Sequence, residues 1–134
     1  MQTFLPYSNF VECANVLDYK RLGKQRIEAL QILRILIGHS KSNAWKNHPA
    51  VKMWEGSEAY LAEYLNTCII EWIKRGYKNT IVMPSFDKSS NIPAWLGDER
   101  LHSSHRASLL MKNPNWYNKF QWKEEPKIQY WWPK

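Results

Sequence analysis

The sequence predicts an all-α protein: a compact, single-domain helical bundle over residues 1–134, with long loops and an aromatic C-terminal tail. Residues 22–37 and 58–75 place apolar side chains at helical spacing. No segment shows the regular alternation of apolar and polar residues that indicates a strand. The hydrophobic content of 44% and the eight tryptophans are typical of a domain with a packed core rather than of a disordered chain.

Local signals define the first elements. Residues 1–9 are expected to be extended, because Pro6 disfavours helix in the residue before it. Ser8 or Asn9 can cap a first helix that runs to about Val16.

The 22–37 helix contains Gly23, which costs roughly 1 kcal/mol in a helix interior and permits a close approach by backbone or ligand. Gly38 can end this helix. A polar loop, 39–48, leads to a short helix beginning at Pro49.

The clearest helix spans 58–75 and ends at Gly76. A long loop, 77–97, follows and carries a polar patch from Asp87 to Asn91.

Asp98 should cap the last helix, which runs to about Lys112 and stops before Pro114. Residues 115–134 are expected to be irregular.

Charge and cysteine content limit the possible functions. The net charge of +7 favours a polyanionic partner such as nucleic acid. Cys13 and Cys68 lie in apolar helical patterns and are expected to be buried free thiols rather than metal ligands. Without an 18-residue apolar run or a basic, apolar leader, the sequence predicts no membrane association and a cytoplasmic location in a bacterium or a phage-infected host.

One polar stripe stands out on the 22–37 helix and the turn before it. Arg21, Lys24, Gln25 and Glu28 share a helix face. The stripe is either a solvated face with a Lys24–Glu28 ion pair, or a site where cations hold phosphates and a carboxylate faces a reacting sugar or base. Glu28 lies where the stripe becomes apolar, so partial burial should raise its pKa.

The last helix offers a second polar face, formed by His102, His105 and Arg106. These residues could be structural, or they could line a phosphate or base pocket. A metal site would need further ligands, and no Cys/His cluster supplies them. His48, in the 39–48 loop, is a weaker candidate of the same kind.

Aromatic rings alternate with amides and a charge in residues 114–122. Trp116 and Tyr117, with Lys119 beside them, either belong to the core or stack on bases, a contact worth about 1–3 kcal/mol per base.

The chain terminus is a possible nucleophile. An α-amino group ordinarily has a pKa near 7.7–8.0, so it is usable as an amine at neutral pH and can form a Schiff base with a sugar aldehyde. The long side chain of Gln2 predicts that Met1 is kept.

Several stretches carry a family resemblance, namely 19–22 (YKRL) followed by Lys24 and Arg26, 71–77 (EWIKRGY), and the 101–112 helix with 114–117 (PNWY). Together they resemble the pyrimidine-dimer DNA glycosylase family, the phage-type endonuclease V of UV repair.

A bacterial branch of that family is similar at three further places, namely 21–26 (RLGKQR), 47–49 (NHP) and 95–98 (WLGD).

The resemblance implies a compact helical domain that excises damaged pyrimidines from duplex DNA, without a cofactor or an obligate protein partner. In the family the N-terminal amine attacks the sugar, and β-elimination then cleaves the strand. The family's mature N-terminus is a threonine, whereas here the amine would be that of Met1. Arg21 occupies the place of the family's catalytic glutamate, so Glu28 or Asp18 would act instead. The expected catalytic residues are Met1, Glu28 and Arg21. The expected DNA contacts are Lys20, Lys24, Gln25, Arg26, His48, His102, His105, Arg106, Trp116, Tyr117 and Lys119.

Two other functions fit the sequence. One is a nucleic-acid-binding module without catalysis. The other is an enzyme acting on another nucleotide-type polyanion, with His102, His105 and Glu28 as acid–base groups. The sequence does not name the damaged base.

Overall fold

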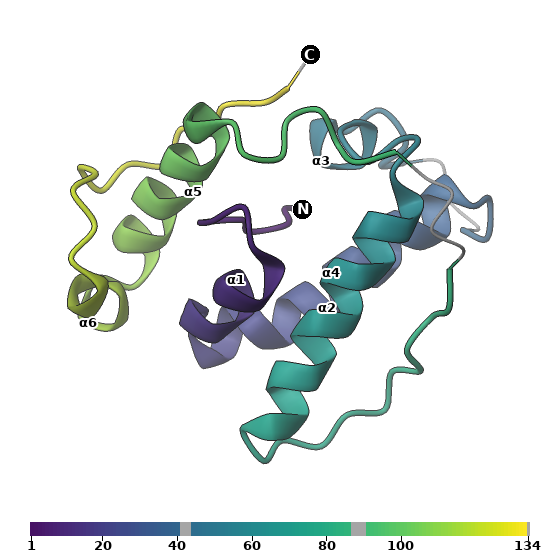
Figure 1. The fold of residues 1–134 in the computed structure, drawn as a ribbon, viewed down its shortest axis with the longest axis horizontal. Helices are drawn as coiled ribbons and strands as arrows, with labels where there is room; N and C mark the ends of the chain where they lie inside the picture. The colour runs from purple at the N-terminus through teal and green to yellow at the C-terminus, as the bar shows by residue number, and fades with distance from the viewer. Residues whose placement is uncertain (41–43, 87–90, 134) are drawn as a thin grey trace.

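The computed structural model describes residues 1–40, 44–86 and 91–133, and within these residues it is helical and contains no strand (Figure 1). This confirms the all-α prediction. The elements are α1 (Phe10–Val16), α2 (Tyr19–Leu36), α3 (Pro49–Lys52), α4 (Glu58–Lys74), α5 (Glu99–Lys112), α6 (Pro114–Tyr117) and a 3₁₀ turn, η1 (Asn118–Phe120). The expected 39–48 loop and 87–91 patch lie partly outside the described residues.

The predicted caps are present. The side chain of Asn9 accepts a hydrogen bond from the backbone N–H of Glu12 and begins α1. Asp98 does the same for the first turn of α5. Gly76 follows α4 with a φ of 90°, a conformation in which glycine is favoured over residues with a Cβ.

The expectation of an irregular tail from residue 115 is wrong for its first part, which forms α6 and η1. Pro114 starts α6, and the side chain of Asn113 accepts a hydrogen bond from the N–H of Trp116. The remaining tail runs back alongside α5, where the N–H of Lys127 donates to the carbonyl of Ala107 (Figure 1).

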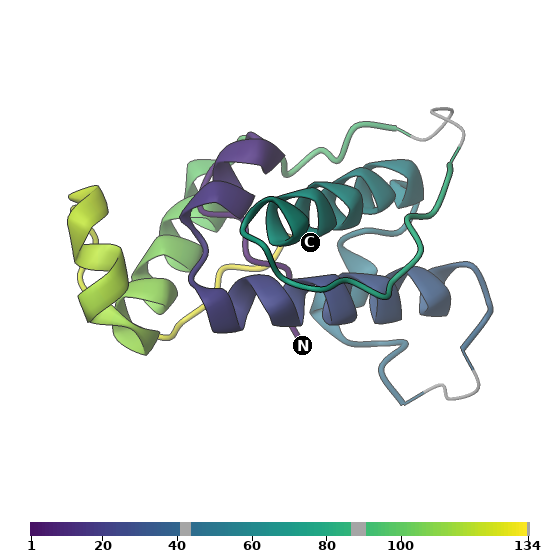
Figure 2. The ribbon, with the colours of Figure 1, turned by 90° about the horizontal axis from the view of Figure 1, so that it is seen from below.

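Helices α2 and α4 pack closely against each other (Figure 2). A Cβ on Gly23 would come within 3.0 Å of the Trp72 ring. Gly23, in the interior of α2, therefore allows the Trp72 side chain of α4 to approach this closely.

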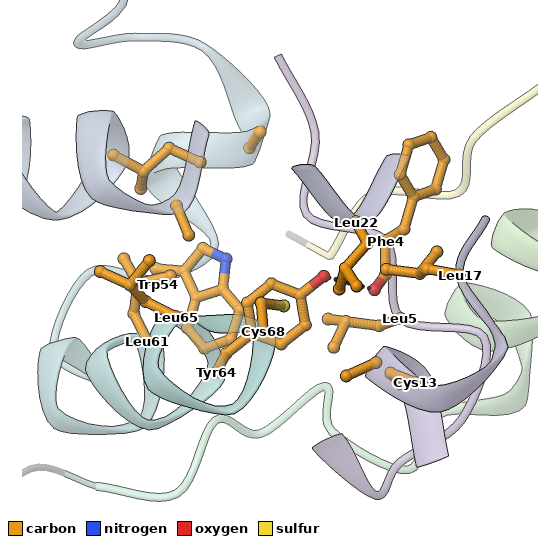
Figure 3. Packing of buried hydrophobic residues seen from close by; sticks show 14 of the residues in the cluster. Phe4, Leu5, Cys13, Leu17, Leu22, Trp54, Leu61, Tyr64, Leu65 and Cys68 are labelled. Carbon is orange, nitrogen blue, oxygen red and sulfur yellow. Dashed lines mark hydrogen bonds between the residues drawn. The ribbon is translucent and has the colours of Figure 1, made fainter. Parts of the chain in front are cut away.

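The N-terminal segment 1–6 lies between α2, α4 and α5, with residues 2–6 buried and Met1 partly exposed (Figure 1). The indole N–H of Trp54 donates to the Thr3 hydroxyl at 3.0 Å. The Tyr64 hydroxyl donates to the Phe4 carbonyl at 2.7 Å (Figure 3). Since Trp54 and Tyr64 are themselves fully buried, the residues that follow Met1 are part of the core, and Met1 is partly buried against it.

Cys13 and Cys68 are buried free thiols, as predicted. Within the described part of the chain, no helix has the length and apolar character needed to cross a membrane.

Candidate active site

A cavity of about 340 Å³ opens where the N-terminus meets α2. It is lined by Met1, Gln2, Phe4, Lys20, Arg21, Lys24, Gln25, Glu28, Lys112 and Tyr130. The stripe predicted from helical spacing therefore faces one cavity, together with the N-terminal residue. Two larger hollows, of about 570 and 890 Å³, lie elsewhere, and neither is lined by Met1 or Glu28.

Gln25 organises the floor of this cavity. Its Nε2 donates to Glu28 Oε2 at 3.1 Å and to the Gln2 carbonyl at 3.0 Å. Its Oε1 accepts from the Phe4 N–H at 2.8 Å and lies 2.7 Å from the Tyr64 hydroxyl oxygen, whose single proton is shared with the Phe4 carbonyl. Gln25 is fully buried, and both its Nε2 donors and its Oε1 are bound to protein groups, so it positions these groups, and its predicted role as a DNA contact is corrected.

Glu28 is half-buried, and this burial raises the pKa of its carboxyl group. The positive N-terminus and Lys24 act in the opposite direction, as do hydrogen bonds from the Gln2 backbone and from Gln25. The predicted direction of the pKa change is confirmed. The charge of the N-terminus is therefore among the influences that favour the ionised carboxylate of Glu28.

Asp18, the other carboxylate considered, is committed to the fold. It is buried and pairs with Arg21 at 3.2 Å. The Tyr117 hydroxyl donates to the Asp18 carboxylate and accepts from the Asp18 N–H. Because these partners occupy Asp18, Glu28 is the carboxylate that faces the cavity.

The rim of the cavity is cationic. Lys20, Arg21, Lys24 and Lys112 all line it. Lys112 joins the site from the end of α5, and Tyr130 joins it from the tail, where its hydroxyl is 2.8 Å from Ser108 Oγ. No local pattern points to these two residues, because both reach the cavity through contacts distant along the chain.

Arg26 does not reach the cavity. Its guanidinium lies over the Trp72 ring, 4.2 Å from the ring centre, and donates to Asn79 Oδ1 at 2.8 Å. Its predicted contact with DNA phosphate is therefore not made at this cavity, since the side chain projects toward α4.

His102 and His105 lie in the core and form hydrogen bonds with the backbone of Leu5, His102 with its carbonyl and His105 with its N–H. The N–H of Gly97 donates to His102 Nε2, so Nδ1 carries the proton and donates to the Leu5 carbonyl at 2.7 Å. His105 Nδ1 accepts from the Leu5 N–H at 2.9 Å. Both histidines are buried, and burial lowers the pKa of His105 to about 3. The prediction that they line the pocket is therefore corrected.

No metal cluster accompanies these histidines. Across residues 1–40, 44–86 and 91–133, no group of three or more His, Cys, Asp or Glu side chains is placed to hold an ion.

Arg106 also binds the N-terminal segment instead of facing the cavity. It donates to the Pro6 carbonyl at 2.7 Å and pairs with Glu99 and Glu124. Only 12% of its side chain is exposed, so its expected contact with DNA phosphate is corrected.

The aromatic tail packs onto the domain. Tyr117 is fully buried, which rules it out as a stacking surface. The Trp116 indole donates to the Val16 carbonyl at 2.7 Å. Lys119 Nζ lies 3.4 Å from the centre of the Trp116 ring. Trp116 and Lys119 lie apart from the cavity lining.

His48 caps α3, where its Nδ1 accepts from the Ala50 N–H at 3.0 Å. Its ring lies between Trp45 and Trp132. Burial lowers the pKa of His48, and the nearby N-terminal charge lowers it further. His48 is therefore close enough to sense the amine, although it does not line the cavity.

A helical domain with a cationic cavity around a half-buried carboxylate has the composition of an enzyme that acts on nucleic acid. A family model described as pyrimidine dimer DNA glycosylase matches residues 1–85, the part that supplies every cavity residue except Lys112 and Tyr130. The chain belongs to the pyrimidine dimer DNA glycosylase family, which makes it a DNA-repair glycosylase. No curated protein and no solved structure matches it.

Proposed function

We propose that this protein excises pyrimidine dimers from duplex DNA and then cleaves the strand, with the N-terminal amine of Met1 as nucleophile and Glu28 as the proton-transferring carboxylate. One observation carries the proposal, which is that Met1 and Glu28 line the same cationic cavity. Residues 2–6 are buried, so the chain next to the amine is anchored in the core, which favours a positioned nucleophile.

The first step is excision of the base. The unprotonated Met1 amine attacks C1′ of the damaged nucleotide, so the N–C1′ bond forms and the glycosidic C1′–N1 bond breaks. The electron pair of the broken bond leaves with the base, and the base takes up the proton that the amine loses. The carboxylate of Glu28 stabilises the positive charge that develops on the sugar and nitrogen.

The second step cleaves the strand. The nitrogen lone pair expels O4′, which takes a proton, and a positively charged Schiff base forms at C1′. Glu28 then removes a proton from C2′, and the C3′–O bond breaks, releasing the downstream strand with its 5′ phosphate. A carboxyl group with a raised pKa suits this exchange of protons near neutral pH. Water finally hydrolyses the Schiff base and restores the amine.

The cations of the rim bind the DNA. Lys20, Arg21, Lys24 and Lys112 surround the entrance and would each approach a backbone phosphate. The amine can reach C1′ only if the damaged nucleotide leaves its place in the stack, which costs least at a base that is already distorted.

The alternative with histidine acid–base catalysis on a free nucleotide loses its basis, because His102 and His105 are buried and hold Leu5.

To test the proposal, a labelled duplex that carries one thymine dimer would be incubated with the protein in the presence of a chelator. The proposal expects a single nick at the dimer and none in an undamaged duplex. Binding without cleavage of the glycosidic bond or of the strand would contradict it and would favour a binding module.

A further inference from the structure

Gln2 carries an unused hydrogen-bond donor at the cavity. The residue is only 5% exposed, and all its other polar groups are occupied. Its carbonyl accepts from Gln25 at 3.0 Å, its N–H binds Glu28, and its Oε1 accepts from the Thr3 N–H at 2.9 Å. Its Nε2 is buried and has no partner among the described residues.

An orphaned donor of this kind is costly. Leaving a buried amide N–H unpaired costs about 1–3 kcal/mol, and such groups are rare in folded proteins. The orientation of the amide is fixed, because Oε1 is the atom that accepts from Thr3. Nε2 is therefore a donor without an acceptor in a residue that lines the cavity, and the acceptor is expected to come with the substrate.

We infer that Gln2 Nε2 donates a hydrogen bond to the O2 carbonyl of the pyrimidine that is excised. This inference rests on the proposed function. The amine of the preceding residue attacks C1′, and pyrimidine O2 is on the carbon next to N1, the atom bonded to C1′. The side chain that follows the nucleophile in sequence is therefore suitably placed for O2.

The bond would do more than recognise the base. When C1′–N1 breaks, the electron pair is shared between N1 and O2, and a donor at O2 stabilises the departing base. The later cleavage of the strand involves no base. Gln2 should therefore assist excision and have no part in the reaction of an abasic site.

Two substitutions separate this role from a structural one. Gln2→Glu keeps an oxygen for the Thr3 N–H and replaces the free donor with an acceptor. Gln2→Met removes the donor without adding charge, and it also removes the acceptor of the Thr3 N–H, so the change that both variants share is the loss of the Nε2 donor. Both are long side chains that should keep Met1 in place, which mass spectrometry of the purified proteins would verify. Gln31→Glu, at an exposed glutamine of the same helix as Gln25, is the matched control.

The experiment compares single-turnover excision from a thymine-dimer duplex with strand cleavage of a duplex that already contains an abasic site. Both Gln2 variants should lose about tenfold to a hundredfold on the dimer, while the abasic rate stays within about twofold of wild type. Equal losses on both substrates, or no loss on the dimer, would overturn the inference. If wild type processes neither duplex, the proposed function fails and the inference falls with it.

Discussion

Gln25 Nε2 lies 3.1 Å from Glu28 Oε2, and the same nitrogen donates to the Gln2 carbonyl at 3.0 Å. One buried amide thus joins the carboxylate on α2 to the segment that ends in the N-terminal amine. The Glu28 carboxylate and the backbone of the residue next to the N-terminal amine are therefore linked through a single side chain.

Replacement of Glu28 tests the chemical role directly. Glu28→Gln keeps an oxygen that can accept from Gln25, but it cannot take up a proton. We expect excision and strand cleavage to fall about 100-fold or more, with affinity for the dimer duplex within about twofold. Glu63→Gln, at an exposed glutamate of α4, is the control. Full activity in Glu28→Gln would show that another group moves the protons.

The same substitution should stabilise the protein. Burial raises the pKa of Glu28 from its ordinary value of 4.5, so ionised Glu28 weakens the folded state at pH values above its folded pKa. This penalty disappears as the pH falls through the folded pKa toward 4.5. Glu28→Gln should therefore have a higher Tm than wild type at neutral pH, and the difference should vanish in acid. A lower Tm at neutral pH would contradict the assigned direction.

His105 should make folding sensitive to acid. Its pKa is lowered by burial from 6.5 to about 3. Between these two pH values the unfolded chain binds a proton at His105 and the folded protein does not. The stability that neutral His105 provides is complete above 6.5 and is lost as the pH falls toward 3, by up to about 1.4 kcal/mol per pH unit. Over this pH range, the free energy of unfolding measured with denaturant should change less with pH in His105→Gln than in wild type. Equal slopes would show that His105 titrates normally.

The cationic rim predicts a particular salt dependence. Lys24→Ala and Lys112→Ala should each lower the slope of log affinity against log salt by about 0.9, equally on damaged and undamaged duplex. Lys74→Ala, at a lysine that does not line this cavity, should leave the slope unchanged. A loss confined to damaged DNA would mean that these lysines recognise the lesion.

Local features of the sequence predicted the helices well. Caps such as Asn9 and Asp98 act within one turn, and the stripe from Arg21 to Glu28 follows from the helical repeat alone. These depend on no distant residue, so the sequence is sufficient.

Residues that meet distant segments were harder to assign. The repeat placed Gln25 beside Glu28, but it could not show that residues 1–6 cover Gln25. His102 and His105 have the same spacing whether they face a pocket or the core. The packing of segment 1–6 against α5 decides this, and no local pattern encodes it.

The central claim is that the N-terminal amine bonds covalently to DNA, and borohydride trapping tests it most directly. The protein would be mixed with dimer, abasic and undamaged duplexes and then reduced, and the adducts would be mapped by mass spectrometry. We predict adducts on the dimer and abasic duplexes, joined through the Met1 nitrogen and absent when that amine is blocked. No adduct on any duplex, or one joined through Lys20 or Lys24, would contradict the account.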